Sequence, residues 1–164
     1  MSMIDSMPAV QGSIKADVAL APYSWLRVGG PADIFFMPKD EADLALFLSS
    51  IDKDIPVTVL GVASNTLIRD GGVEGVVIRL GPAFAKIDID GHRLTAGTAA
   101  LDARVAKAAA EAGIAGLEFY AGVPGTIGGA LRMNAGCYGA ETCDVLRDVV
   151  AIDRRGRRVA RHGR

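Results

Sequence analysis

The segment AGVPGTIGGALRMNAG (residues 121–136) contains five glycines and one proline, and Arg132 is its only ionisable side chain. Glycine loses more backbone freedom on ordering than any other residue, so such a segment weakens a fold unless it is needed. It is needed where the backbone takes positive φ angles or where another group approaches it closely. The alternative is that these glycines only make tight turns and allow close helix packing.

A second loop with exposed backbone N–H groups is expected at residues 60–72, directly after the apolar run VTVL. Ser64 and Asn65 add short polar side chains to this loop. Backbone N–H groups gathered at a turn after a strand bind anionic oxygens, above all those of phosphate. Neither segment contains lysine or matches G-x-G-x-x-G or the G-x-x-x-x-G-K-[ST] phosphate loop, which disfavours an ordinary nucleotide-hydrolysing site.

Two such loops in one chain predict a ligand with two adjacent phosphates, held between two lobes. Backbone amides can neutralise most of a diphosphate, which is consistent with the low charge of both loops. A dinucleotide with a flat apolar ring would suit Ala121, Val123 and Ile127. No metal is expected, because no carboxylates are suitably paired, and Cys137 and Cys143 are expected to be free thiols.

The elements expected to position the first loop form a βαβ unit. The apolar runs at 32–38, 56–61 and 75–80 predict strands. The pattern of residues 39–52 predicts a helix with acidic residues in its first turn, where the helix dipole favours them. Strand, helix and strand within about 30 residues indicate a parallel pairing. Residues 1–23 have only a weak pattern.

The second half of the chain has a different pattern. Residues 85–98 alternate apolar and polar side chains around an Asp-Gly pair, which predicts a β-hairpin. Residues 101–116 predict an alanine-rich helix ended by Gly113 or Gly116. Residues 145–161 predict a strand, a turn and the start of another strand.

The composition fits a folded α+β protein of one ordinary domain or two small lobes, since 50% of the 164 residues are hydrophobic. We predict an N-terminal lead-in (1–22), a first lobe with a small parallel βαβ sheet (23–82) and a second lobe with a mixed sheet (83–164). No stretch is long and apolar enough for a signal peptide or a membrane span, which predicts a soluble, cytoplasmic protein.

Charge gives no reason to expect nucleic acid or a membrane surface as a partner. The formal net charge is −1, so no overall field attracts either of them. Six arginines lie within residues 154–164 and could form a patch for nucleic acid or phosphate. Aromatic residues are not interleaved with them, so we favour a solvated edge strand.

Three ordered motifs resemble the MurB family, the UDP-N-acetylenolpyruvoylglucosamine reductases, also called UDP-N-acetylmuramate dehydrogenases. The motifs are LRVGGPAD (26–33), VLGVASNTLIRDGGVEGVVIRL (59–80) and GLEFYAGVPGTIGGALRMNAGCYGAE (116–141). The resemblance implies the two-lobed FAD-binding fold shared with vanillyl-alcohol-oxidase-like flavoenzymes, not a Rossmann fold. It also implies a reaction of peptidoglycan synthesis: NADPH reduces FAD, and the flavin delivers hydride to the enolpyruvyl UDP-sugar, giving UDP-N-acetylmuramate.

The same resemblance implies which residues contact FAD. Gly61, Ser64 and Asn65 match the loop that holds the FAD diphosphate. The second, flavin-contacting stretch is matched by Gly122, Pro124, Gly125, Thr126, Gly128, Gly129, Asn134, Ala135 and Gly136.

Two departures from the family pattern are visible. The first loop of the family usually reads G-x-G-S-N, whereas Ala63 stands at the second glycine here. If that position needs a positive φ, alanine costs on the order of 1 kcal/mol and weakens FAD binding without abolishing it. The family's catalytic arginine, serine and glutamate motifs do not occur in residues 1–164, so no catalytic residue is assigned.

Three interpretations of function follow. The first is the FAD-binding part of a reductase whose partners are NADPH and a UDP-sugar, expected to be a monomer. The second is a flavin-binding protein of the same fold without reductase activity. The third is a non-enzymatic α/β interaction domain with glycine-rich turns.

Overall fold

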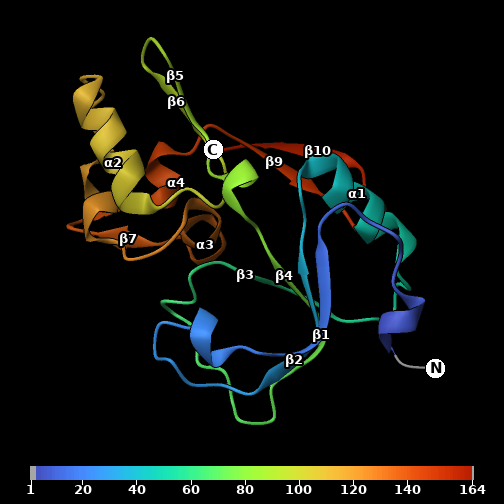
Figure 1. The fold of residues 1–164 in the computed structure, drawn as a ribbon. Helices are drawn as coiled ribbons and strands as arrows, with labels where there is room; N and C mark the ends of the chain where they lie inside the picture. Colours follow the sequence, from blue (N-terminus) through green and yellow to red (C-terminus); the bar gives the residue numbers. More distant parts are fainter. Residues whose placement is uncertain (1–2, 164) are drawn as a thin grey trace. The chain divides into compact units, whose positions relative to one another are not determined.

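The computed structural model describes residues 3–163, which divide into two compact units (Figure 1). The first unit contains the described residues up to Gly81 together with Val150–Val159. The second contains Pro82–Val149 and the described residues from Ala160 onward. Within the described residues, no helix has the length and apolar character needed to cross a bilayer.

A four-stranded sheet forms the first unit, with its strands in the order β1-β2-β4-β3. Strands β2, β3 and β4 run parallel, as predicted, and β1 lies antiparallel on the outer side of β2. The two strands that flank the predicted helix do not pair directly, because β4 lies between them. The elements of this unit are η1 (Met3–Ser6), β1 (Ser13–Ala19), η2 (Ala21–Tyr23), β2 (Pro31–Met37), α1 (Glu41–Ser50), β3 (Val57–Leu60) and β4 (Val73–Arg79).

Strand β1 lies in the segment that has only a weak sequence pattern. Ile14, Ala16 and Val18 are its half-buried residues, and the residues between them are exposed. Asp17 interrupts the regular backbone with a φ of 52°. An antiparallel edge strand with one solvated face needs no continuous apolar run, which explains why the pattern did not predict it.

The two faces of this sheet are covered differently. Helix α1 packs on one face, where Phe47 stacks on Phe36 with ring centroids 4.1 Å apart. The other face is covered by the loops 20–30 and 61–72, and Tyr23 stacks there on Phe35 at 4.8 Å. In Figure 1, α1 and the segment of η2 lie on opposite sides of the strands. The loop-covered face therefore carries the first predicted binding loop.

Helix α1 begins where the pattern predicts, with the side chain of its N-cap residue Asp40 accepting a hydrogen bond from Asp43 N at 2.9 Å. Asp43 is itself buried and accepts from the backbone N–H groups of Gln11, Gly12 and Lys39 at 2.7–3.0 Å. Burial alone would raise the pKa of Asp43, but these hydrogen bonds lower it below the ordinary value. The carboxylate therefore ties the N-terminal segment to the helix.

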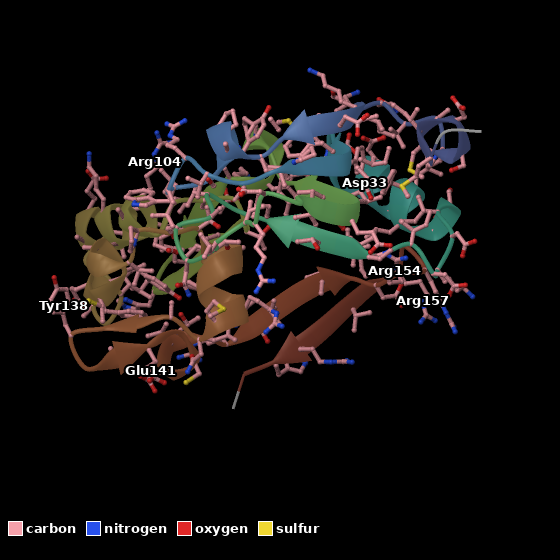
Figure 2. The ribbon with its side chains drawn as sticks, turned by 90° about the horizontal axis from the view of Figure 1, so that it is seen from below. Asp33, Arg104, Tyr138, Glu141, Arg154 and Arg157 are labelled. Atoms are coloured by element: carbon pink, nitrogen blue, oxygen red, sulfur yellow. The ribbon has the colours of Figure 1, made fainter. Side chains whose placement is uncertain are left out.

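Several C-terminal arginines contact their own chain. Arg154 donates from Nη2 to three carbonyl oxygens of the loop after α1, within residues 52–55, at 2.9–3.2 Å. Arg157 pairs with Asp153 at 2.8 Å, and Arg158 pairs with a glutamate of α1 at 3.0 Å. Figure 2 shows Arg154 and Arg157 close together at this end of the unit. These arginines therefore help to hold the first unit together. We had predicted only a solvated edge strand for residues 154–164.

The second unit is built from short antiparallel hairpins and helices around the core residues Ala100, Val105, Ala106, Phe119, Tyr120 and Ala130. The predicted hairpin and alanine-rich helix are confirmed, and Gly113 follows the helix with a φ of 68°. The mixed sheet of the α+β fold lies in the first unit. The later elements are η3 (Pro82–Phe84), β5 (Ile87–Asp90), β6 (Arg93–Ala96), α2 (Asp102–Glu111), η4 (Glu118–Gly122), α3 (Ile127–Met133), β7 (Gly136–Cys137), β8 (Ala140–Glu141), α4 (Thr142–Val145) and the paired strands β9 (Asp148–Ile152) and β10 (Arg158–His162).

Candidate functional site

The first predicted binding loop follows β3 directly. Its residues Gly61, Ser64 and Asn65 surround Ala63, which is only 6% exposed and packs into the core of the first unit. Ala63 has a φ of 52°, so the position does take the left-handed conformation that favours glycine. The carbonyl oxygen of Ala63 accepts a hydrogen bond from Trp25 N at 3.4 Å.

The loop at 20–30 is braced against this first loop. The buried Ser24 hydroxyl donates to the carbonyl oxygen of Val28 at 2.8 Å. Gly30 N donates to Arg69 O at 2.9 Å, and a Cβ added at Gly30 would overlap the carbonyl oxygen of Asp70. The adjacent glycines of the LRVGGPAD motif therefore allow one loop to pack against the other.

A pocket that the sequence did not predict opens beside these two loops. It has a volume of about 370 Å³ and lies entirely within the first unit. Its lining residues are Pro22, Tyr23, Ser24, Trp25, Arg27, Val62 and Arg79, and we call it the Trp25 pocket. The available signal was the single tryptophan of the chain, close to the glycine pair of LRVGGPAD.

In the second unit, the glycine-rich segment forms the end of η4, a short bend and helix α3. Several of its backbone N–H groups already have partners in the chain. Gly125 N donates to Val123 O at 3.0 Å, and Gly128 N donates to Thr98 O at 2.8 Å. The N–H group of Gly128 is therefore not available to a ligand, and a Cβ at this position would lie 3.0 Å from Thr98 O.

The glycines of this segment are needed for close packing within the chain. Among the described residues, the glycines with positive φ all lie outside residues 121–136. A Cβ at Gly122 would lie 2.7 Å from Cys137 Sγ, and one at Gly136 would lie 2.8 Å from Ala140 O. A Cβ at Gly129 would meet only Thr126 Oγ1, at 3.6 Å, which leaves room for a group outside the chain.

The end of the segment is fixed by side-chain hydrogen bonds. Asn134 ends α3 with a φ of 47°. Its Nδ2 donates to Glu141 Oε2 at 2.7 Å, and its Oδ1 accepts from Cys143 N at 2.9 Å. Ala135 O accepts from the Thr142 hydroxyl at 2.8 Å. Figure 2 shows Tyr138 at the tip of the β7–β8 turn, directed outward.

Asp102, the first residue of α2, is a buried carboxylate that sequence reasoning missed. It is 0% exposed, and neither oxygen has a hydrogen-bond partner among the described residues. Burial raises the pKa of Asp102 to about 6, and the nearby N–H of Gly125 opposes this only in part. The polar group therefore lies unpaired beside the glycine-rich segment.

The predicted site residues form two groups, one in each unit. Gly61, Ser64 and Asn65 belong to the first unit, and the others lie along one continuous segment of the second. Within residues 3–163, no three His, Cys, Asp or Glu side chains are placed to hold a metal ion, and both cysteines are free thiols. The two groups therefore offer backbone and small polar groups for binding and no assembled cluster of acids and bases.

The fold and these loops define a class of cofactor-binding domain. Residues 32–160 match the family described as the FAD binding domain. The chain therefore belongs to this FAD-binding domain family.

More specifically, the chain is homologous to the UDP-N-acetylenolpyruvoylglucosamine reductases (MurB) and corresponds to their N-terminal FAD-binding part. It is 64% identical over 160 residues to the reductase of Phenylobacterium zucineum, covering 97% of this chain and 53% of that protein. It is 60% identical over 160 residues to the reductase of Maricaulis maris, covering 97% of this chain and 51% of that protein. The chain spans about half the length of the curated relatives it matches.

Solved structures give the same fold. The MurB structure from Thermus caldophilus superimposes with a TM-score of 0.76 and 31% identity, covering 94% of this chain and 53% of that one. The 6-hydroxy-D-nicotine oxidase of Arthrobacter nicotinovorans superimposes with a TM-score of 0.66 at 15% identity, covering 94% of this chain and 36% of that one. At 15% identity, the likeness to the nicotine oxidase concerns the fold alone. The predicted fold of the vanillyl-alcohol-oxidase and MurB type is thus confirmed.

Proposed function

We propose that this chain is the FAD-binding part of a cytoplasmic reductase that converts UDP-N-acetylglucosamine enolpyruvate into UDP-N-acetylmuramate for peptidoglycan synthesis. The observation that carries this proposal is the 64% identity over 160 residues to a UDP-N-acetylenolpyruvoylglucosamine reductase. The partners of the whole enzyme would be NADPH and the UDP-sugar. FAD, when bound, accepts hydride from NADPH and supplies it to the enolpyruvyl double bond.

The described residues fit FAD in two respects. The loop of Gly61, Ser64 and Asn65 follows a parallel strand, so its backbone N–H and hydroxyl groups suit a diphosphate. At Gly129 the space that a side chain would occupy is almost free of protein atoms, which suits close approach by a flat apolar ring. The other residues proposed to contact the flavin are Gly122, Pro124, Gly125, Thr126, Gly128, Asn134, Ala135 and Gly136.

A second candidate function is flavin binding without reductase activity. It is favoured by the coverage of about half of each reductase, 53% in the relative from Phenylobacterium zucineum. Both candidates require FAD, whereas a purely structural interaction domain does not.

The test is to purify the 164-residue chain, saturate it with FAD, remove free cofactor and record the visible flavin spectrum. We expect one FAD per chain. Asn65→Ala should weaken binding by about 0.5–1.5 kcal/mol, the range for one neutral hydrogen bond. Ser50→Ala, on the exposed side of α1, is the matched control and should bind FAD normally. Absence of bound flavin in a folded chain would refute both flavin-based candidates.

A further inference from the structure

The Asp102 carboxylate has no role in the function proposed so far. It is the first residue of α2, its side chain is 0% exposed, and it stands in sequence between the core residues Ala100 and Val105. Neither of its oxygens has a hydrogen-bond partner among the described residues. An ionised carboxylate is costly to bury without a partner, so such a group either stays neutral or acts on its surroundings when it ionises.

Backbone hydrogen bonds join the start of α2 to the glycine-rich segment. Asp102 N donates to Gly125 O at 3.2 Å. Two further bonds, of 2.8 and 2.9 Å, run from residues 127–128 to residues 98–100. All of these residues belong to the second unit. Asp102 therefore lies directly beside the bend of residues 123–126, which precedes α3.

This bend is closed by one short-range hydrogen bond. Gly125 N donates to Val123 O at 3.0 Å, which forms a three-residue γ-turn around Pro124. Proline fixes φ at roughly −65°, a value that suits such a turn. The Gly125 N–H also lies near enough to the Asp102 carboxylate to lower its pKa, although the two form no hydrogen bond in the structure. One N–H group therefore has two competing acceptors.

The charge of Asp102 decides between these acceptors. A hydrogen bond to an ionised carboxylate is about twice as strong as one between neutral groups, and a neutral carboxylic acid is a weaker acceptor. Burial raises the pKa of Asp102 to about 6, and the Gly125 N–H opposes this only in part. The carboxyl group therefore changes its charge over the interval of about pH 5 to 7.

The other ionisable groups around this core do not share this behaviour. Burial, and to a smaller extent the charge of Asp102, raises the pKa of Tyr120 above its ordinary value of 10, which the Thr142 hydroxyl opposes. Tyr120 therefore stays neutral while Asp102 titrates. Cys137 is half-buried, and the remaining ionisable side chains of the elements around the core are exposed. These are Arg104, Lys107 and Glu111 on α2, Glu118 on η4, Arg132 on α3, Glu141 on β8, Asp144 on α4, and Asp88, Asp90, His92 and Arg93 on the β5–β6 hairpin.

We propose that Asp102 is a pH-dependent positioning residue for the bend of residues 123–126, acting through the N–H group of Gly125. While Asp102 is neutral, this N–H stays on Val123 O and the bend keeps the shape seen in the structure. When Asp102 ionises, the carboxylate draws the N–H away, the γ-turn opens, and Pro124 and Thr126 leave the positions proposed to contact FAD. The consequence for FAD rests on the proposed function, whereas the exchange of the hydrogen bond does not require it.

NMR on the cofactor-free chain tests the hydrogen-bond exchange. The Cγ chemical shift of Asp102 reports its ionisation, and the amide proton shift of Gly125 reports its acceptor. In the parent chain both should titrate together, with a midpoint at about pH 6. Asp102→Asn keeps the size and polarity but cannot ionise, so its Gly125 shift should stay constant from about pH 5 to 8. Glu111→Gln makes the same change at an exposed position of the same helix and should titrate like the parent.

FAD titrations measure the consequence for binding. With a pKa of about 6, the neutral fraction of Asp102 falls from about three quarters at pH 5.5 to about one thirtieth at pH 7.5. Apparent affinity scales with the fraction of the chain that is competent to bind, so the Kd for FAD should rise by roughly ten- to thirtyfold in the parent and in Glu111→Gln. In Asp102→Asn it should change by less than about twofold.

Three results would overturn the proposal: an Asp102 carboxyl group that does not titrate in this pH interval, a Gly125 shift that stays constant while Asp102 titrates, or the same pH dependence of FAD affinity in the parent and in Asp102→Asn. If Asp102→Asn does not fold by circular dichroism, the titrations of the parent still decide the first two points. A chain that shows the Gly125 titration but takes up no FAD at any pH overturns the proposed function and the role of the bend in cofactor binding, while the hydrogen-bond exchange stands.

Discussion

Ala63 places a methyl group where the backbone has a φ of 52°, in the loop proposed to hold the FAD diphosphate. Ala63→Gly relieves about 1 kcal/mol of left-handed strain, but it removes a buried methyl worth about 0.8 kcal/mol and adds freedom to the unfolded chain. These effects nearly cancel, so we expect a small change in the free energy of unfolding and FAD affinity that is equal or better. Urea unfolding and FAD titration measure the two quantities.

The matched control for Ala63 is Ala106, which is similarly buried at 8% but lies inside α2. Ala106→Gly has no strain to relieve and should lose roughly 1–2 kcal/mol from helix propensity and the buried methyl together. A clear loss of FAD binding in Ala63→Gly, with the chain still folded, would contradict the strain argument.

The unpaired Asp102 carboxylate should make stability depend on pH. Its pKa is about 6 in the folded chain, above the ordinary value of 3.8, so between these pH values the folded state holds a proton that the unfolded state releases. The contribution of Asp102 therefore becomes unfavourable as pH rises from about 4 to 6, by on the order of 2 kcal/mol. Asp102→Asn cannot ionise and should be stabilised relative to the parent chain at pH 7.5 more than at pH 4.5.

Thermal or urea unfolding of both chains at the two pH values measures this difference. Asp43→Asn is the control of opposite sign, because backbone hydrogen bonds lower the pKa of Asp43 below 3.8. The Asp43 carboxylate is ionised at both pH values, so its replacement should cost stability at both. An Asp102→Asn effect that is the same at both pH values would show that the carboxylate has a partner outside the described contacts.

At the scale of elements, the two glycines of helix α3 have different surroundings: Gly128 packs against the chain, and Gly129 is open to a ligand. A Cβ at Gly129 would meet only Thr126 Oγ1 at 3.6 Å, whereas a Cβ at Gly128 would lie 3.0 Å from the Thr98 carbonyl oxygen. Gly129→Ala should therefore raise the free energy of unfolding by about 0.5–1 kcal/mol, since alanine favours the helix. If the flavin lies against this helix, the same methyl should weaken FAD binding by about tenfold.

Gly128→Ala is the informative contrast, because it should destabilise the chain through Thr98 whether or not FAD is bound. Gly81→Ala, where a Cβ would meet nothing within 4 Å, is the neutral control. Melting temperatures and FAD titrations of the three variants decide the point. If Gly129→Ala stabilises the chain and leaves FAD affinity unchanged, the flavin does not lie against α3 at this position.

The helices and strands that the sequence predicted are those with a clear local pattern of apolar residues. Strand β4 reads clearly as a buried run because both of its faces are covered. Its position between β2 and β3 depends on which edges meet in space, and no local pattern encodes that choice. Strand β1 was not predicted although its residues alternate between exposed and half-buried, because only Ile14, Ala16 and Val18 mark its inner side and none of them is fully buried.

The same distinction applies to the candidate site. The glycine-rich segment was identified from composition, but the neighbours of its glycines are set by contacts between residues distant in sequence, such as Gly128 with Thr98. The burial of Asp102 and the approach of Arg79 to the Tyr23 ring are also tertiary. The MurB motifs predicted the cofactor, whereas the Trp25 pocket is visible only in the structure.

At the scale of the whole molecule, residues proposed to bind FAD lie in both units, and the chain covers 53% of its relative from Phenylobacterium zucineum. These residues are Ser64 and Asn65 in the first unit and the segment around Gly129 in the second. Binding of FAD to either group should stabilise the unit that contains it. The remaining requirement of the reaction is the orientation of the UDP-sugar and the stabilisation of charge on it.

The last prediction is that the 164-residue chain, loaded with FAD, does not make UDP-N-acetylmuramate at a measurable rate. Hydride addition to the enolpyruvyl group leaves negative charge on the neighbouring carbon and carboxylate, which needs a positioned cation and then a positioned acid. The arginine, serine and glutamate motifs of the family do not occur in residues 1–164, so neither group is assigned in this chain.

The measurement follows NADPH consumption by the FAD-loaded chain with and without the enolpyruvyl UDP-sugar. A slow consumption that does not depend on the sugar is expected, since reduced flavin reacts with oxygen. Reconstitution with a polypeptide that carries the remaining half of a relative is the positive control, because it restores the missing motifs. Sugar-dependent turnover by the 164-residue chain alone, near that of a full-length relative, would require a catalytic residue within these 164 positions. Asp102, as the buried carboxylate beside the glycine-rich segment, would then be the first residue to replace.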